Sequence, residues 1–476
     1  MSKYQYDVIV IGGGSGGLVA ARITTALGAR VCLIDKERLG GDCLYSGCVP
    51  SKSLIHAAKI VKTAREAAML GTAETEINFQ VDMAKVAARI QGVIERVGEA
   101  EQVYVQNVDV KFGQAEFVGD HELSLNGQIL TAKTFIIATG SHPRIPEIPG
   151  LARAGYLTNQ DVFDLTRLPE RLAVVGGGPI GVELAQAFAR LGSKVTIIQG
   201  PDRLLPKEEP EMSGVVADAL GRDGLEILTG TRLKKVSGES GPKQIEAMRG
   251  EEVIQLEMDD LLIAVGRQPN LEGLKLEAAG VKFSDKGIEV NEYLQTSAPN
   301  IYAIGDVIGG YLFTHVAAYQ AGIASRNALV PIGRKKVDYR ALPWVTFTDP
   351  EVSRVGQTEA EARQEHTHIK VIHYPWHDID RAQADGETEG FIKLILNDKG
   401  QEILGAHLVG ARSGEVLAEI TLAMQHKLGI SGILDTIHAY PTLATGLQSA
   451  AFEAYLSSSS LASAKKVLGP VLSFTG

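Results

Sequence analysis

Residues 6–17 read YDVIVIGGGSGG, so an apolar strand passes directly into a turn of glycines. An amphipathic helical pattern follows to about Gly28, and a second apolar strand follows over residues 30–35. This order predicts a βαβ unit that binds a dinucleotide, with Gly12, Gly14 and Gly17 at the motif positions. The first glycine permits a tight turn, the second lets the backbone approach a pyrophosphate, and the third lets the helix pack on its strand.

The same pattern occurs a second time. Residues 172–181 read LAVVGGGPIG, and a helix to about Leu191 and a strand over residues 194–198 follow. Here Gly176, Gly178 and Gly181 take the motif positions. One glycine motif is a weak signal, but two of them, each between a strand and a helix, predict two dinucleotide sites.

Each unit should end near a residue that contacts the adenosine ribose, about 20 positions after the glycines. Asp35 takes that place in the first unit, and a carboxylate can accept both ribose hydroxyls. Gln199 takes it in the second unit. An amide is neither the acid typical of NAD sites nor the arginine typical of NADP sites, so the sequence leaves the choice of nicotinamide cofactor open.

Three further apolar strands end in glycine, at residues 135–140, 261–266 and 301–306. We interpret them as buried parallel strands, each followed by a loop that faces a ligand. The candidate cofactor contacts on these loops are Thr139, Gly140, Gly266, Gly305 and Asp306. After residue 339 the pattern changes to alternating strands over 390–396 and 403–409 and helices over 414–427 and 447–457, which indicates a separate αβ domain.

Length and charge narrow the class of protein. A chain of 476 residues favours roughly three domains. The net charge of -10 argues against a nucleic-acid partner, which needs a basic face. The early apolar run lacks the basic flank and the length of a signal peptide, and no run approaches the roughly 20 apolar residues of a membrane span. We therefore expect a cytoplasmic protein without a membrane partner.

The three cysteines are too few for a secreted disulfide framework. Cys32 lies in an apolar run and is expected to be a buried small hydrophobe. Cys43 and Cys48 lie in residues 40–52, GGDCLYSGCVPSK, which open a helix predicted from Ser53 to about Met69.

A spacing of five residues rises about 7.5 Å along a regular helix, more than the usual Cα separation in a disulfide. A bond between Cys43 and Cys48 therefore needs an irregular turn, which Gly47 can provide. The N-terminus of a helix also favours a thiolate. A close pair in a cytoplasmic protein is more often catalytic than structural, and no second pair is present to complete a zinc site.

The chain resembles the FAD-dependent pyridine nucleotide–disulfide oxidoreductases, the family of dihydrolipoamide dehydrogenase, glutathione reductase and mercuric reductase. The resemblance covers nearly the whole chain. In order, it rests on the first glycine motif, residues 43–52, residues 138–140, the second glycine motif, Gly305-Asp306, and residues 347–351. It implies an α/β fold with two Rossmann-like dinucleotide-binding domains plus a C-terminal αβ dimerisation domain. The implied domains are FAD-binding residues 1–148, NAD(P)-binding residues 149–272, a central FAD-binding part at 273–336, and an interface domain at 337–476.

The resemblance also implies the chemistry. FAD would bind the first glycine motif and Gly41, with Asp306 at a ribityl hydroxyl, and NAD or NADP would bind the second motif. Cys48 would face the flavin and Cys43 would be the outer sulfur that meets the substrate. Lys52 and Glu183 match the family's ion pair beside the flavin. Electrons would pass between NAD(P)H, FAD and the Cys43–Cys48 disulfide in a homodimer.

The last domain departs from the family pattern. Dithiol-handling members carry a His-x-His-Pro-Thr run whose second histidine is the acid/base, oriented by a glutamate five positions later. Here Tyr440 holds the acid/base position and Thr445 the orienting position. A phenol with an ordinary pKa near 10 is a poor proton acceptor at neutral pH. His438 either replaces the missing base or is a structural histidine.

The cysteines that the chain has and lacks indicate the class of substrate. Mercuric reductases end in a vicinal cysteine pair, whereas residues 472–476 of this chain read LSFTG. A soft metal ion could therefore bind only the thiolates of Cys43 and Cys48. No resident metal is expected. We expect a dihydrolipoamide dehydrogenase-like enzyme whose substrate is a small or protein-bound disulfide or dithiol, such as a lipoyl group. The alternatives are a mercuric reductase-like enzyme, a flavoprotein that reduces quinones or dioxygen, and a non-catalytic flavoprotein.

Overall fold

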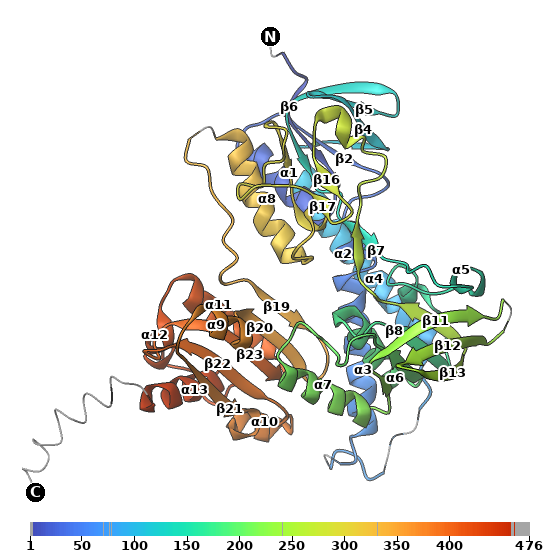
Figure 1. Cartoon of the computed structure of the whole chain (residues 1–476), viewed down its shortest axis with the longest axis vertical. Helices are drawn as coiled ribbons and strands as arrows, with labels where there is room; N and C mark the ends of the chain where they lie inside the picture. The colour runs from blue at the N-terminus through green and yellow to red at the C-terminus, as the bar shows by residue number, and fades with distance from the viewer. Residues whose placement is uncertain are drawn as a thin grey trace, which may run out of the picture.

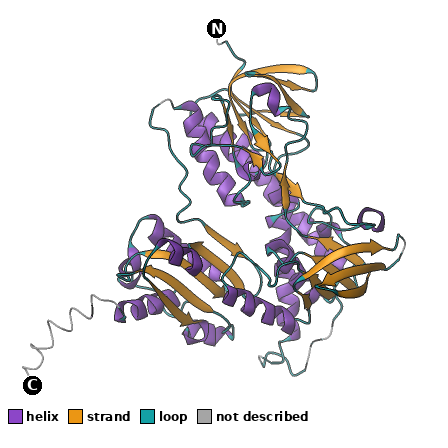
Figure 2. Ribbon diagram, viewed as in Figure 1, coloured by secondary structure: helices purple, strands orange, loops and turns teal. Residues whose placement is uncertain are grey.

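The computed structural model describes residues 3–69, 71–75, 77, 79–239, 241–330, 332–457 and 461. These residues form three α/β bodies (Figures 1 and 2). The first body combines the N-terminal part of the chain with the segment that ends near residue 330, the second is the green part of Figure 1, and the third is the C-terminal part. The mixed α/β class predicted from the sequence is confirmed.

The first body is built on a sheet that mixes parallel and antiparallel strands. Its parallel part runs in the order β3-β2-β1-β6, and β18 pairs with the other side of β6. β6 continues into an antiparallel ribbon with β5 and β4. The strands are β1 (Tyr6–Ile11), β2 (Val31–Asp35), β3 (Asp109–Phe112), β4 (Ala115–Gly119), β5 (Glu122–Leu125), β6 (Gln128–Ile137) and β18 (Ile301–Ala303). Because β18 comes from far along the chain, two distant segments share one sheet.

Two helices that are distant in sequence pack together in the first body. They are α1 (Ser15–Ala26), which follows the first glycine motif, and α8 (Thr314–Leu329). Their apolar faces meet the β1 and β2 side chains in one core, which includes Val8, Leu18 and Ala321. Of the five parallel strands, β1, β2, β18 and the second half of β6 are largely buried and apolar, as expected for strands covered on both faces.

The second body repeats the dinucleotide-binding arrangement. Its parallel sheet has the order β10-β9-β8-β14, and α6 (Pro179–Leu191) follows the second glycine motif. A separate antiparallel sheet has the order β11-β12-β13. The strands are β8 (Arg171–Val175), β9 (Lys194–Ile198), β10 (Glu226–Leu228), β11 (Thr231–Ser237), β12 (Lys243–Arg249), β13 (Glu252–Met258) and β14 (Asp260–Ile263), and the other helices are α5 (Leu151–Ala154) and α7 (Pro210–Arg222).

The two connections between the first and second bodies run side by side. β7 (Ser141–Pro143) leaves the first body and pairs antiparallel with β15 (Arg267–Pro269), which returns to it. The short hairpin of β16 (Phe283–Ser284) and β17 (Gly287–Ile288) follows β15. Both connections therefore pass one narrow junction, and the ligand-facing loops predicted at Gly140 and Gly266 meet there.

The helices around the cysteine pair differ from the sequence prediction. A short helix α2 (Gly41–Tyr45) carries Cys43, and α3 (Cys48–Arg65) begins at Cys48 itself. The predicted start at Ser53 and end near Met69 were wrong. Gly47, with φ -116° and ψ -117°, breaks the two helices apart, so α3 can start five residues earlier. α4 (Met83–Gln102) packs against α3.

The third body is an antiparallel sheet with helices packed on it. The strand order is β19-β20-β23-β22-β21, with a core that surrounds the fully buried Trp376. The strands are β19 (Pro343–Thr346), β20 (Glu351–Gly356), β21 (Ile369–Pro375), β22 (Phe391–Asn397) and β23 (Ile403–Gly410). The helices are α9 (Glu359–Glu365), α10 (Asp380–Asp385), α11 (Ser413–Gln425), α12 (Gly429–Leu434) and α13 (Thr445–Leu456).

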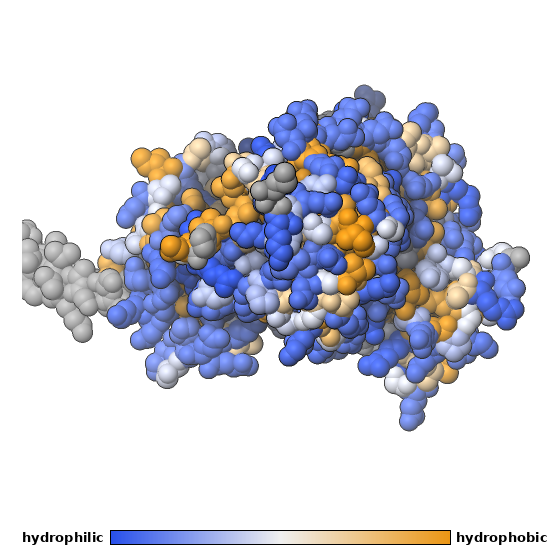
Figure 3. Space-filling model, turned by 90° about the horizontal axis from the view of Figure 1, so that it is seen from above, coloured by the Kyte–Doolittle hydropathy of each residue, from blue (hydrophilic) through white to orange (hydrophobic). Residues whose placement is uncertain are grey.

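The surface seen from above is largely hydrophilic, with apolar side chains in small separate patches (Figure 3). Within the described ranges, no helix combines the length and the hydropathy needed to span a bilayer.

Candidate redox site

Both glycine turns have a geometry that only glycine accommodates. Gly12 has φ +105° and Gly176 has φ +113°, and a Cβ on either would lie 2.3 Å from a backbone carbonyl oxygen. A Cβ on Gly17 would lie 1.7 Å from the Gly12 oxygen, and one on Gly181 would lie 1.8 Å from the Gly176 oxygen. The first and third glycines thus serve the tight turn and the close packing of helix on strand.

The middle glycines face open space. A Cβ on Gly14 would meet nothing closer than the Gly41 Cα at 3.7 Å, and one on Gly178 would meet no atom within 4 Å. Each glycine lies at the N-terminus of its helix, α1 or α6, where unpaired backbone N–H groups favour an anion. Both turns therefore leave room where a dinucleotide pyrophosphate would bind, and the chain fits FAD and a nicotinamide dinucleotide in this respect.

In both dinucleotide-binding units, the side chain at the end of the second strand accepts a hydrogen bond from the glycine turn. Asp35 Oδ2 accepts the N–H of Gly13 at 2.7 Å, and Gln199 Oε1 accepts the N–H of Gly177 at 2.7 Å. The two acceptors differ in their surroundings. Asp35 lies on the wall of the large cavity described next, whereas Gln199 is buried and its Nε2 donates to the Arg203 oxygen.

One cavity of about 1550 Å³ connects the two glycine turns with the cysteine pair. The predicted site residues on its wall are Gly12, Gly14, Asp35, Gly41, Cys43, Cys48, Lys52, Thr139, Gly140, Gly178, Glu183, Gly266, Gly305 and Asp306. Most of the residues singled out in the sequence thus meet in one place, although they come from the first and second bodies of the fold.

Asp306 lies at the junction of the two bodies. Its Oδ2 accepts the Ser141 hydroxyl at 2.6 Å and lies 3.7 Å from Arg267 Nε. Arg267 also pairs with Asp42 beside Cys43. Burial raises the pKa of Asp306, while Ser141 and Arg267 oppose the rise. The Asp306 carboxylate therefore lies on the wall of the cavity that Cys43 and Cys48 also line.

Cys43 and Cys48 are free thiols on the cavity wall. The Cys48 Sγ lies 3.4 Å from the Thr314 hydroxyl oxygen, at the N-terminus of α8. The hydrogen bond between the two thiols raises the pKa of Cys43 and lowers that of Cys48. Thr314 and the nearby Lys52 ammonium lower the pKa of Cys48 further. In the reduced pair the Cys48 sulfur is therefore the better site for negative charge, and Cys43 retains a proton.

Cys32 is fully buried, as predicted, and takes no part in the site. Burial raises its pKa to about 12, which keeps the thiol neutral and unreactive.

Lys52 and Glu183 form an ion pair of 2.7 Å between α3 and α6. The Glu183 side chain is 7% exposed and that of Lys52 is 35% exposed. Glu183 is thus buried beside a partner, and is not an exposed helix acid. Its second oxygen accepts the backbone N–H of Phe347 at 2.8 Å, and the Phe347 ring lies 4.4 Å from the Lys52 ammonium.

His438 and Tyr440 lie away from this cavity in the same chain. The His438 side chain is 4% exposed, with Nε2 2.8 Å from Glu419 Oε1 and Nδ1 2.9 Å from the Thr436 oxygen. Tyr440 is 73% exposed and its hydroxyl donates to Asp380 at 2.9 Å. That hydrogen bond raises the pKa of Tyr440, so still less of the side chain is present as phenolate, the form that could accept a proton, at neutral pH. Both residues lie in the segment between α12 and α13, two helices that lie far from α2 in Figure 1.

Sequence reasoning missed three residues of the site: Thr314, Arg267 and Phe347. Arg267 directly follows Gly266 and could have been found from that position. Thr314 follows Asp306 after an irregular loop, and no spacing rule connects it to Cys48. Phe347 was noted only as part of a family run. Among the described residues, no group of three or more His, Cys, Asp or Glu side chains is placed to hold a metal ion.

A chain with two dinucleotide turns, a dithiol between them and a separate αβ domain has the architecture of a flavoprotein disulfide reductase. The protein belongs to the pyridine nucleotide-disulphide oxidoreductases: this family matches residues 6–321, and its dimerisation domain matches residues 342–451. The family uses FAD and NAD(P)H. The chain is thus an FAD-dependent NAD(P)-linked disulfide oxidoreductase, as predicted, and its dimerisation domain supports a homodimer.

Relatives fall into both predicted branches. A mercuric reductase of Staphylococcus aureus is 38% identical over 94% of this chain and 82% of its own length. A dihydrolipoyl dehydrogenase of Thermus scotoductus is also 38% identical, over 94% of this chain and 96% of its own. The HOCl-induced flavoprotein disulfide reductase RclA from Escherichia coli superimposes with a TM-score of 0.84 at 32% identity, covering 93% of this chain and 99% of RclA. The same reductase has also been solved as a Cu(II) complex.

Proposed function

We propose that this chain relays electron pairs through Cys48 to Cys43 and on to a substrate at Cys43. The observation that carries the proposal is the position of Cys48 and of the Lys52–Glu183 pair on the wall of one cavity that reaches both glycine turns. Bound FAD would supply hydride chemistry with NAD(P)H, which a protein side chain cannot perform. The first glycine turn, Gly41 and Asp35 would hold FAD, and the second turn would hold the nicotinamide dinucleotide.

The protein's own residues would then manage charge and protons. Reduction of the Cys43–Cys48 bond takes up two electrons and leaves a thiolate on Cys48, which Thr314 and Lys52 stabilise. Cys43 then attacks one sulfur of a substrate disulfide, and the other substrate sulfur leaves with a proton. The Cys48 thiolate next attacks the Cys43 sulfur, which restores the disulfide and releases the second substrate sulfur as a thiolate that takes up a proton from water. In sum, one disulfide is reduced to two thiols and one dithiol is oxidised.

We also propose the domain boundaries that were predicted from the sequence, because the connecting strands between the bodies lie close to them. The antiparallel pair of connecting strands β7 and β15 supports boundaries near residues 148 and 272. The start of β19 at Pro343 supports a boundary near residue 337. The homodimer would bring the third body of one chain to the cavity of the other, because Tyr440 and His438 do not reach the cysteine pair within one chain.

The substrate that we propose is a small or protein-bound disulfide or dithiol of the lipoyl type. A dithiol pair next to a reactive cavity exchanges with such a substrate without any further group. The proton on Cys43 slows this exchange, because the Tyr440 hydroxyl donates to Asp380 and does not act as a base. A positioned general base contributes about 10² to 10⁴-fold, so we propose slow turnover.

A metal ion is the second candidate, and the missing base favours it. A thiophilic ion displaces the thiol proton when it binds, so its reduction does not depend on an imidazole. The two electrons of the dithiol would reduce one mercuric ion to the element or two cupric ions to cuprous ions. The mercuric reductase relatives and the Cu(II) complex of RclA support this candidate.

Steady-state assays under anaerobic conditions decide between the two candidates. NADH and NADPH are each offered with lipoamide, glutathione disulfide, mercuric ion, cupric ion or a quinone as the acceptor. Slow but saturable lipoamide reduction that needs Cys43 supports the disulfide substrate. If lipoamide is ignored while either metal ion is reduced rapidly, the metal candidate replaces it. Reduction of quinones alone, undiminished without Cys43, would contradict the cysteine relay itself.

A further inference from the structure

Residues 346–350, the turn between β19 and β20 that we call the 346–350 segment, lie along one face of α6. Glu183 accepts the N–H of Phe347 at 2.8 Å. Gln186 accepts the N–H of Asp349 at 2.8 Å and donates to its carbonyl oxygen at 2.9 Å. Arg190 Nη1 lies 2.8 Å from Asp349 Oδ2. Residues three, four and seven positions apart share one face of a helix, so this row fixes the segment along two turns of α6.

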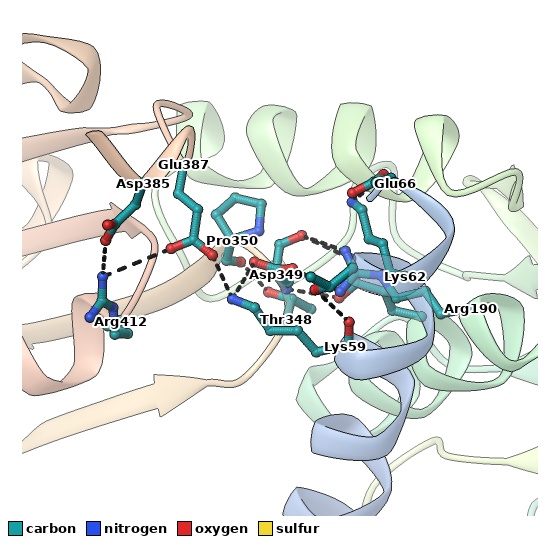
Figure 4. A network of polar contacts seen from close by, with 12 residues as sticks. Lys59, Lys62, Glu66, Arg190, Thr348, Asp349, Pro350, Asp385, Glu387 and Arg412 are labelled. Carbon is teal, nitrogen blue, oxygen red and sulfur yellow. Dashed lines mark hydrogen bonds and ion pairs between the residues drawn. The ribbon is translucent and has the colours of Figure 1, made fainter. Parts of the chain in front are cut away.

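The same segment contacts α3 on its other side. Lys59 Nζ lies 3.6 Å from Asp349 Oδ1 and 2.8 Å from Glu387 Oε1. Figure 4 shows Lys59 reaching between these two carboxylates, with Arg190 approaching Asp349 from α6. About two turns of α3 nearer to Cys48, the Lys52 ammonium lies against the Phe347 ring. The segment therefore lies between the helix that carries Cys48 and Lys52 and the helix that carries Glu183.

The charges around Asp349 are mutually compensated. Burial alone would raise the pKa of Asp349, but Arg190 and Lys59 together lower it, so the carboxylate stays ionised. Arg190, with 4% of its side chain exposed, also pairs with Asp223 at 2.8 Å. A buried charge that loses its partner is strongly unfavourable, so this cluster holds Asp349 in one place.

We infer that Asp349 is a positioning residue for the Lys52–Glu183 pair beside the cysteines. Its bonds to Arg190 and Lys59 fix the 346–350 segment, whose Phe347 N–H holds the Glu183 carboxylate and whose Phe347 ring covers the Lys52 ammonium. The third body thereby positions the Lys52–Glu183 ion pair, whose two residues belong to the first and second bodies. The inference rests on the proposed relay, because its effect is measured through the thiolate of Cys48.

The test compares Asp349→Asn with Glu387→Gln in the flavin-loaded enzyme. Both variants deprive Lys59 of a carboxylate, but Glu387 lies outside the 346–350 segment. In each enzyme the pH midpoint of the long-wavelength thiolate-to-flavin absorbance and the rate of flavin reduction by NAD(P)H are measured. For Asp349→Asn we expect a higher midpoint, since a displaced Lys52 stabilises the thiolate less, and reduction slowed about 10- to 100-fold by misplacement. Glu387→Gln should match the wild type in both readouts.

A second variant covers the case that Asp349→Asn does not fold. Gln186→Met removes both backbone bonds to Asp349 without removing a charge, and should move both readouts in the same direction. A folded Asp349→Asn or Gln186→Met enzyme with the wild-type midpoint and rate overturns the inference, as does a Glu387→Gln enzyme that changes as much as Asp349→Asn. If the wild type itself shows no thiolate-to-flavin absorbance, the proposed relay fails, and the positioning role fails with it.

Discussion

The sulfur of Cys48 lies 3.4 Å from the hydroxyl oxygen of Thr314, a residue 266 positions further along the chain. Thr314 begins α8, and Cys48 begins α3, so the N-termini of two helices meet at one sulfur. Both helix termini and the hydroxyl favour a negative charge there. Together with the hydrogen bond from the Cys43 thiol, which is the larger influence, this contact favours the thiolate on Cys48.

Replacement of Thr314 by Val should raise the pH at which the Cys48 thiolate forms. A hydrogen bond to a charged group is worth about 1.5 to 3 kcal/mol, which corresponds to a rise of about one to two pH units. Thr314→Ser keeps the hydroxyl and is the matched control. The pH titration of the long-wavelength absorbance of the two-electron-reduced enzyme measures the shift, and equal midpoints for Thr314→Val and Thr314→Ser would show that the hydroxyl is irrelevant.

Replacement of Cys43 by Ser should abolish turnover of disulfides but leave the thiolate-to-flavin absorbance. The Cys43 thiol is also the largest influence that lowers the pKa of Cys48. The serine hydroxyl of Cys43→Ser can still donate a hydrogen bond to the Cys48 sulfur, so the absorbance should persist. Cys48→Ser is the matched control and should lose the absorbance at every pH. Full disulfide reductase activity in Cys43→Ser would disprove the outer-sulfur role.

The two glycine turns should be separable by mutation. Both Gly14 and Gly178 have room for a side chain in the folded chain, so Gly14→Val and Gly178→Val should fold. Gly14→Val should be purified without flavin, because its side chain fills the space for the FAD pyrophosphate. Gly178→Val should stay yellow, with about one FAD per chain as in the wild type, but show a raised KM for NAD(P)H. Flavin content after acid release and initial rates give both results, and a Gly14→Val enzyme that retains FAD would contradict the assignment of the first turn.

The active enzyme should be a homodimer. Light scattering of the holoenzyme at assay concentrations should give twice the mass of one chain, because the third body would complete the partner's site. The dilution at which the dimer dissociates should coincide with the loss of disulfide reductase activity. A monomer with full activity would show that a single chain suffices.

Replacement of Tyr440 by His tests the missing base directly. An imidazole at this place should increase lipoamide turnover, by up to about 10² to 10⁴-fold if it is well oriented. Thr445 offers no carboxylate, so the double variant Tyr440→His with Thr445→Glu should gain more than the single one. Tyr440→Phe is the control, and it should leave turnover close to that of the wild type. A fall in lipoamide activity in Tyr440→His would contradict the proposed role of this position.

The sequence predicted the parts of this protein that follow local rules. The glycine turns around Gly12 and Gly176 have short-range steric causes, so their geometry could be derived from the order of strand, glycine and helix. The buried strands were found for the same reason, since a run of apolar residues that ends in glycine is a local signal. The resemblance to a family then placed Lys52 beside Glu183, a pair that no spacing connects.

Other features could not be derived because they depend on long-range packing. The start of α3 at Cys48 depends on the break at Gly47, and the amphipathic pattern after Ser53 continues the helix without marking its first residue. The contact of Thr314 with Cys48 exists because α1 and α8 pack together on one sheet. The hydrogen bond from Tyr440 to Asp380 joins two segments of the third body that are 60 residues apart, and no local sequence pattern connects them.

The buried Arg190 cluster also determines how the protein comes apart. Asp349 belongs to the third body, Arg190 and Asp223 to the second, and Lys59 to the first, so a body that unfolds alone removes at least one charged partner from the cluster around Arg190. Because Arg190 has two carboxylate partners and Lys59 is 41% exposed, the loss of one partner weakens the contact between the bodies without leaving a bare buried charge. Heat should therefore melt all three bodies in a single cooperative transition, and a calorimetric trace should split into separate peaks only when this cluster is broken.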